Sequence, residues 1–231
     1  MIKLFIRHSS SSAEPTLTVS APPARVNKAW EEIPDPGDKC PYCVEQLKKK
    51  PEARTKCPHC GKYIYVKRGK PVTVEQAEAI ETEWTRMLTE EANNKDREEF
   101  GIGLDEYEKM KRGSSKTHAE IIYALAWGHL KAGDKPPSGY YSLALFAKNH
   151  GLDFMPARME AARQEILGYR DQEFITRVSI VACENGTCNR CRKADGQSYK
   201  IEEALNSMPL PIKGCTCDDH FCICSYAPKV C

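Results

Sequence analysis

Residues 40–61 read CPYCVEQLKKKPEARTKCPHCG and contain two Cys-x-x-Cys pairs, Cys40 with Cys43 and Cys57 with Cys60. Each pair presents two thiolates from one tight turn, and two such turns complete the tetrahedron of sulfur ligands that Zn²⁺ adopts in structural sites. Because four thiolates leave no open position for water, we expect this zinc to be structural rather than catalytic. Gly61 follows the second pair and permits the positive φ that such a turn often needs.

The segment around these pairs, about residues 38–69, resembles the zinc-ribbon family. Residues 63–66, Tyr-Ile-Tyr-Val, predict the strand that would close its hairpin. The resemblance implies a small module whose metal replaces the hydrophobic core that about thirty residues cannot build. Four free buried cysteines are the alternative. A thioredoxin-like redox pair would need a βαβ context, which the surrounding sequence lacks.

The same segment is strongly basic. Residues 38–70 contain ten Lys or Arg side chains and three Asp or Glu, a local charge of +7. Basic side chains can bind phosphates and tyrosines can stack on bases, so this surface is a candidate for nucleic-acid binding. The candidate contacts are Lys48, Lys49, Lys50, Tyr63, Tyr65 and Arg68. Alternatively, the three consecutive lysines form a solvated loop that pairs with the acidic helix expected after it.

The composition of the whole chain is that of an ordinary soluble protein. Its 231 residues include 34 Lys+Arg and 32 Asp+Glu, a net charge of +2, and 41% are hydrophobic. This balance argues against a chain built wholly around nucleic acid or membrane. No apolar run approaches the roughly 20 residues that cross a bilayer, and residues 1–6 are too short for a signal-peptide core. We therefore expect a cytoplasmic protein with reduced cysteines and no membrane partner.

The twelve cysteines fall into two clusters with none between residues 61 and 182. The C-terminal cluster contains a third Cys-x-x-Cys pair, Cys188 with Cys191. Cys222 and Cys224 are one residue apart, so in an extended strand only one of them would face that pair. The expected ligands of a second zinc site are Cys188, Cys191, Cys215 and Cys222, with Cys224 as the alternative ligand. Cys183, Cys217 and Cys231 are then spare or part of a less regular site, and ordinary buried thiols remain the competing interpretation.

Residues 174–228 resemble the C-terminal domain of phage minor head (Mu F-like) morphogenesis proteins. The resemblance rests on the Cys188-x-x-Cys191 pair, Asp195-Gly196, a helical stretch, a proline-rich stretch and Cys222-Ile223-Cys224. The chain departs from the family pattern because Ile223 replaces the usual arginine and Cys215 stands near the place of the proline-flanked histidine. The resemblance implies a compact metal-binding domain, phage structural proteins as partners, and a virion-associated location if the protein comes from a phage.

Between the clusters the apolar spacing predicts helices. They are expected at about 73–92, 104–112, 117–131 and 140–149, and from Pro156 onward, with Thr73 and Gln76 forming a capping box and Ser138 capping the fourth. Residues 175–181 predict a strand. The fold class is therefore α+β, with an N-terminal zinc ribbon, a central antiparallel helical segment and a small cysteine-rich α+β domain. The expected divisions are an N-terminal strand and linker at 1–37, then 38–70, 71–171 and 172–231.

The sequence contains no pattern that predicts an active site. His118 and His129 are on one expected helix without a carboxylate at matching spacing, which is typical of packing or surface histidines. We therefore expect a zinc-binding interaction or assembly protein that is not an enzyme and binds a protein partner. A nucleic-acid-binding regulator is the first alternative. A metal-dependent hydrolase, whose C-terminal metal keeps an open position, is the second.

Overall fold

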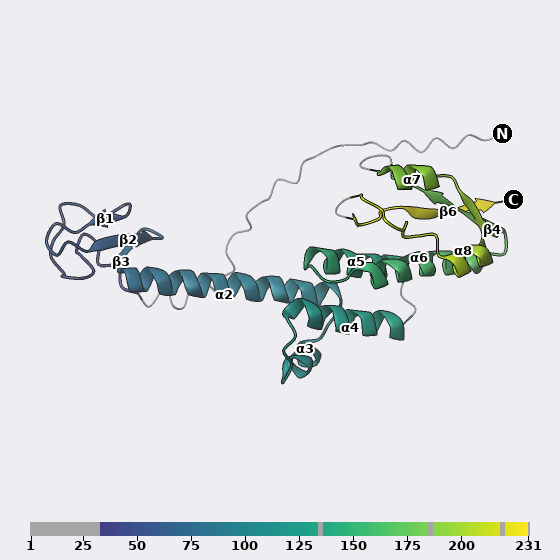
Figure 1. Cartoon of the computed structure of the whole chain (residues 1–231). Helices are drawn as coiled ribbons and strands as arrows, with labels where there is room; N and C mark the ends of the chain where they lie inside the picture. The colour runs from purple at the N-terminus through teal and green to yellow at the C-terminus, as the bar shows by residue number, and fades with distance from the viewer. Residues whose placement is uncertain (1–32, 134–135, 184–186, 218–219, 231) are drawn as a thin grey trace, which may run out of the picture. The chain divides into compact units, whose positions relative to one another are not determined.

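The computed structural model describes residues 33–133, 136–183, 187–217 and 220–230. These residues form seven α-helices and two three-stranded antiparallel sheets, a mixed α+β structure (Figure 1). In order, the elements are β1 (Thr55–Lys56), β2 (Tyr63–Lys67), β3 (Lys70–Val72), α2 (Val74–Glu99), α3 (Leu104–Lys111), α4 (His118–Ala132), α5 (Pro137–Asn149), α6 (Met155–Arg170), β4 (Ile175–Val181), α7 (Asn189–Ala194), β5 (Ser198–Lys200), α8 (Ile201–Ser207) and β6 (Ser225–Val230). The strand and nearly all of the linker expected at 1–37 lie outside the described residues.

The chain divides after Glu90 into two compact units. The described part of the first unit contains a sheet in the order β1-β2-β3, in which Thr55 pairs with Ile64 and Tyr65 pairs with Val72. Its small core consists of buried Cys40, Leu47, Cys57 and Ile64, with Tyr42 and Cys43 packed against them. Half of these core residues are cysteines, so the apolar cluster by itself is small.

Helix α2 begins at the expected capping box. The amide of Gln76 donates to Thr73 Oγ1 at 3.2 Å, and the amide of Thr73 donates to Gln76 Oε1 at 2.9 Å, which confirms the predicted pair. The helix continues to Glu99, seven residues beyond the expected end at Ala92. It ends where Gly101 adopts a φ of 66°, a conformation that glycine reaches at little cost.

The second unit contains a helical core made by α3, α4, α5 and α6. Ile121, Ile122 and Leu143 are fully buried in it. Helix α5 begins at Pro137, and its N-cap is Pro136 with no side-chain cap, so the expectation that Ser138 caps this helix is wrong. Proline is favourable in the first turn of a helix because its φ is already helical and the N–H that it lacks would have no hydrogen-bond partner within the helix.

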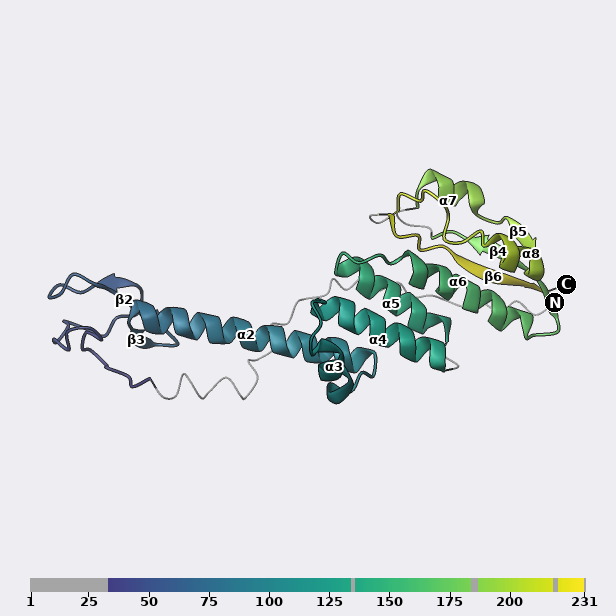
Figure 2. The same cartoon turned by 60° about the horizontal axis from the view of Figure 1, so that its bottom comes forward.

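The second sheet has the order β5-β4-β6, with β4 in the centre. Helix α6 lies along this sheet in both views (Figures 1 and 2), and α8 packs on β4 and β5. Val178, Ile180, Leu210 and Tyr226 are buried in the resulting core. Six cysteines belong to the same core. Phe221, the residue before Cys222 in the sequence, packs into the helical core instead. None of the described helices is long and apolar enough to cross a membrane.

Candidate metal centres

Two turns of matching backbone geometry hold the N-terminal tetrad, which we define as Cys40, Cys43, Cys57 and Cys60. In the first turn the amide of Val44 donates to the Cys40 carbonyl at 2.9 Å, and in the second the amide of Gly61 donates to the Cys57 carbonyl at 3.0 Å. Val44 and Gly61 both have positive φ, 64° and 72°. The positive φ of Gly61 confirms the role expected for this glycine. Val44 is β-branched, and such residues rarely adopt a positive φ.

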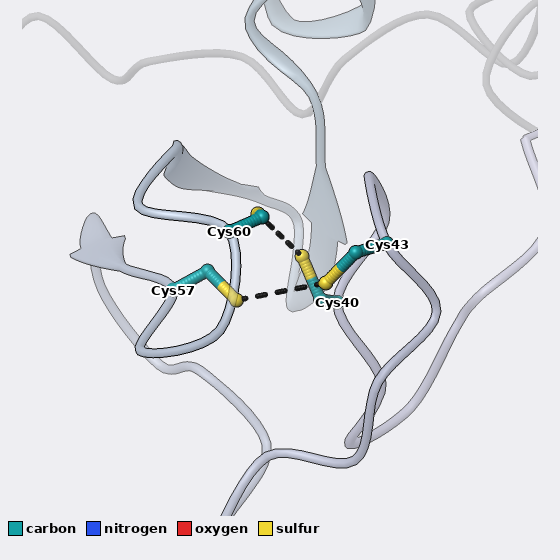
Figure 3. A group of neighbouring side chains, drawn as sticks. All are labelled: Cys40, Cys43, Cys57 and Cys60. Atoms are coloured by element: carbon teal, nitrogen blue, oxygen red, sulfur yellow. Dashed lines mark hydrogen bonds between the residues drawn. The ribbon is translucent and has the colours of Figure 1, made fainter.

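The four sulfur atoms of this tetrad point toward one another (Figure 3). Sγ of Cys40 lies 3.9 Å from that of Cys60, and Sγ of Cys43 lies 3.8 Å from that of Cys57. A zinc ion with Zn–S bonds of about 2.3 Å requires ligand sulfurs about 3.8 Å apart, whereas a disulfide joins them at about 2 Å. The spacing therefore suits an ion at the centre of the four sulfurs.

Local hydrogen bonds prepare part of this tetrad for metal. The backbone amides of Cys60 and His59 point at Cys57 and lower the pKa of its thiol to about 6, so it is largely a thiolate at neutral pH. The amide of Glu45 lowers the pKa of Cys43, but desolvation and the neighbouring thiols outweigh it and raise that pKa to about 12. A metal ion that binds here must displace protons, so its affinity rises with pH.

The C-terminal tetrad, which we define as Cys188, Cys191, Cys215 and Cys217, joins α7 to the loop before β6. Cys188 is the N-cap of α7 and Cys191 lies in its first turn. The Sγ–Sγ distances from Cys191 are 3.5 Å to Cys188, 3.4 Å to Cys215 and 3.7 Å to Cys217. These distances are also close to those of a tetrahedral thiolate site, so this tetrad could hold a metal ion.

The C-terminal tetrad includes Cys217, which was expected to be spare or part of a less regular site, in the place expected for Cys222. The chain contains two Cys-x-Cys pairs, 215–217 and 222–224. If both pairs are considered as ligand pairs, Cys217 becomes a candidate ligand. Cys183 is exposed and belongs to neither tetrad, and Cys231 lies outside the described residues.

Cys222 and Cys224 form an adjoining triad with Cys191. All three are buried, their sulfurs lie within 4.8 Å of one another, and Sγ of Cys222 is 4.0 Å from that of Cys191. The sequence predicts that only one of Cys222 and Cys224 reaches the ion bound by the Cys-x-x-Cys pair, whereas the structure places both sulfurs near that of Cys191. Strand β6 begins only at Ser225, so the alternation of side chains in an extended strand does not apply to them.

Backbone amides donate to several of the C-terminal sulfurs. The amide of Cys188 lies 3.1 Å from Sγ of Cys217, and the amide of Ile212 lies 3.4 Å from Sγ of Cys222. The backbone amide of Thr216 is the main cause of a pKa of about 5 for Cys188. For Cys222 the main cause of a similar pKa is the thiol of Cys224. Such donors stabilise thiolates, the form that binds metal.

A buried arginine completes this environment. Arg158 of α6 is 3% exposed, and its Nε donates to the carbonyl of Cys222 at 2.8 Å while its Nη2 donates to that of Cys224. Its charge therefore lies beside the triad and offsets negative sulfur. The sequence did not predict this role for Arg158, because nothing in the neighbouring residues distinguishes it from an exposed helical arginine.

The candidate nucleic-acid contacts are partly engaged within the protein. Lys48, Lys49 and Lys50 are exposed, and Lys50 forms a 2.7 Å ion pair with Asp35 rather than with the acidic helix. Arg54 lies over the rings of Tyr63 and Tyr65, with its Cζ 4.4 Å and 5.2 Å from their centroids. The Arg68 guanidinium lies 5.3 Å from the Trp84 ring. The exposed lysines are therefore the part of this surface best placed to meet a phosphate.

Both histidines of α4 have carboxylate partners from other elements. His118 lies between Tyr107, at 2.8 Å from its hydroxyl, and Asp96, at 3.2 Å from its carboxylate. His129 lies 2.9 Å from a carboxylate oxygen of Glu106. The partners come from α2 and α3, so spacing along α4 alone could not have indicated them.

No family model, curated protein or solved structure matches this chain. The zinc-ribbon and Mu F-like resemblances therefore rest on the motif residues alone.

Proposed function

We propose that this chain is a zinc-binding interaction and assembly protein without catalytic activity of its own. The observation that carries the proposal is the sulfur spacing in both tetrads, because four thiolates about 3.4–3.9 Å apart suit one tetrahedral zinc. A four-thiolate ion has no open position for a reacting water, so its contribution is to the fold. The function then belongs to the surfaces that the metal ions hold in shape.

The proposed partners are phage structural proteins, and the support for them is the motif resemblance in residues 174–228. The experiment mixes the purified full chain with portal protein encoded beside its gene and follows the complex by analytical ultracentrifugation. We expect a complex that forms with zinc-loaded protein and weakens after Cys188→Ser. A gene neighbourhood without portal or terminase genes, together with no complex, would reject the phage assignment.

Zinc binding in the first unit is tested by Cys57→Ser. We expect this variant to lose one zinc ion and the fold of residues 38–72 while α4, α5 and α6 keep their helical signal. The reason is that metal binding and folding are one event in so small a module, where zinc contributes about 10–16 kcal/mol in peptides. The readouts are native mass spectrometry and amide NMR. Cys183→Ser is the matched control and should change neither, because Cys183 is outside both tetrads.

A nucleic-acid-binding role is the second candidate, and the exposed Lys48, Lys49 and Lys50 favour it. Replacing all three with Gln should weaken oligonucleotide binding alike for all sequences. It should also flatten the dependence of log K on log salt by up to about three units, one for each phosphate contact. If the unmodified protein binds no oligonucleotide at ~50 mM salt, this candidate is rejected and the assembly proposal is unaffected.

A further inference from the structure

Six of the eight cysteines in the second unit form one continuous group of sulfur atoms rather than a tetrad and two bystanders; they are Cys188, Cys191, Cys215, Cys217, Cys222 and Cys224. Cys191 belongs to the tetrad and also to the triad with Cys222 and Cys224. We propose that this group holds two zinc ions that share the thiolate of Cys191. This inference extends the zinc binding proposed above from one ion to two at this position.

The distances from Cys191 support a bridging role. Its sulfur lies 3.4–3.7 Å from the other three tetrad sulfurs and 4.0 Å from that of Cys222. All of these values are near the separation of about 3.8 Å between two sulfurs that bind the same zinc. A thiolate has more than one lone pair, so one sulfur can bind an ion on each side. Cys191 is fully buried between the two sets of ligands.

One ion would leave two buried cysteines without a role. Cys222 and Cys224 are 2% and 1% exposed, and they stand beside the tetrad, where any thiolate would repel its four negative sulfurs. Two Zn²⁺ ions bring six thiolates to a net charge of about −2, which is no more negative than one ion with four thiolates and two neutral thiols. The guanidinium of Arg158, bonded to the carbonyls of Cys222 and Cys224, offsets part of the remainder.

The sulfur spacing favours two single ions over a cluster of four irons and four sulfides. In such a cluster each cysteine binds a different iron, with inorganic sulfide between the irons, so the cysteine sulfurs are held apart. Here several sulfurs lie only 3.4–4.0 Å from Cys191. The first ion would be bound by the tetrad. The second would be bound by the thiolates of Cys191, Cys222 and Cys224, with a water as its fourth ligand.

The metal content of the full chain tests the proposal directly. Native mass spectrometry of protein loaded with zinc under reducing conditions should show three ions per chain, one in the N-terminal tetrad and two in the second unit. The double variant Cys222→Ser/Cys224→Ser should show two ions, and Cys183→Ser should keep three. Two ions in the unmodified chain, unchanged in the double variant, would overturn the shared-thiolate proposal and leave one-ion binding intact. Fewer than two would overturn zinc binding at one of the tetrads as well.

A second measurement does not depend on the folding of any variant. With ¹¹³Cd²⁺ as the probe in the unmodified chain, the Cys191 β-protons should correlate with two different cadmium resonances. The β-protons of Cys188 and Cys217 should correlate only with the first ion, and those of Cys222 and Cys224 only with the second. A single cadmium partner for Cys191 would overturn the proposal.

Discussion

At the scale of single residues, Arg158 connects the helices to the cysteine groups. It is buried and donates to the carbonyls of Cys222 and Cys224, and its guanidinium lies 5.4 Å from the ring centroid of Tyr141. Arg158→Met would fill similar space but leave both carbonyls without their donors. Hydrogen bonds from a charged group contribute about 1.5–3 kcal/mol each, so for two bonds we expect a loss of about 3–6 kcal/mol in the free energy of unfolding, measured in urea.

A control for this variant lies on the same helix. Arg163 is exposed, and its contact with Glu160 is 3.9 Å long, so Arg163→Met should change the free energy of unfolding by no more than about 0.5 kcal/mol. An equal decrease in the free energy of unfolding for both variants would show that the hydrogen bonds of Arg158 to the two carbonyls contribute nothing beyond what an exposed helical arginine contributes.

His118 provides a prediction about pH. Burial lowers its pKa below the ordinary 6.5, although the Asp96 carboxylate opposes the shift; His150 and Arg97 also face it and lower the pKa further. The unfolded chain therefore binds a proton more readily than the folded one, and the free energy of unfolding falls as the pH drops below about 6.5. His118→Gln should reduce this slope between pH 7 and 5, by at most about 1.4 kcal/mol per pH unit.

The comparison with unmodified protein isolates this histidine from the cysteines, because both proteins carry the same metal sites and lose them together in acid. His59→Gln is the control: His59 is exposed and hydrogen-bonds with the Gln46 carbonyl. A steeper slope for His118→Gln than for the unmodified protein would contradict the stated direction of the pKa.

Residue-level roles were predictable where the local sequence determines them. The spacing of Cys40, Cys43, Cys57 and Cys60 indicated one group because each pair requires only a tight turn. The roles of Cys217 and Arg158 depend on where distant segments meet, with 29 positions separating Cys217 from Cys188 and 64 separating Arg158 from Cys222. No local pattern in a single sequence indicates such tertiary contacts between distant segments.

At the scale of elements, the capping box of α4 allows the contribution of one helix cap to protein stability to be measured. Glu120 donates its amide to Thr117 Oγ1 at 3.3 Å, and its carboxylate accepts from the Thr117 amide at 2.6 Å. Thr117→Ala removes the side-chain half of this capping box and should cost about 1 kcal/mol of stability, measured by thermal or urea unfolding. Ser138→Ala should cost little, because Ser138 of α5 makes no cap bond. A cost at Ser138 equal to that at Thr117 would contradict the assignment of the caps.

The elements themselves were largely predictable from apolar spacing, and their ends were not. The expected helices at 104–112 and 117–131 correspond to α3 and α4 within a residue, and the strand at 175–181 is β4. Helix α2 runs past its apolar stripe because Lys95, Arg97, Glu98 and Glu99 favour a helix and no Gly or Pro lies between residues 74 and 101, although Asn93, Asn94 and Asp96 are weak helix formers. Helix α5 starts early because Pro137 suits a first turn.

At the scale of the whole molecule, the described residues contain apolar cores that differ in their dependence on cysteine. The helical core of α3, α4, α5 and α6 consists of aliphatic and aromatic side chains, with no cysteine among its described members. The core beneath β4 and β6 contains five buried cysteines together with Val178, Ile180 and Leu210. Both cores belong to one compact unit, so the division expected at residue 172 stays a prediction.

This difference predicts how the protein responds to the removal of metal. Chelation under reducing conditions would leave thiols and thiolates packed together in the N-terminal tetrad and in the C-terminal core, and burying uncompensated charge is costly. The helical core keeps its apolar contacts, such as the packing of Phe100 on Phe146 at a ring-centroid distance of 5.4 Å. Hydrogen exchange should therefore accelerate strongly in β2, β4, β6 and α7 and much less in α4 and α5. Equal acceleration in α4 and β4 would show instead that the helices fold only together with the metal-binding core.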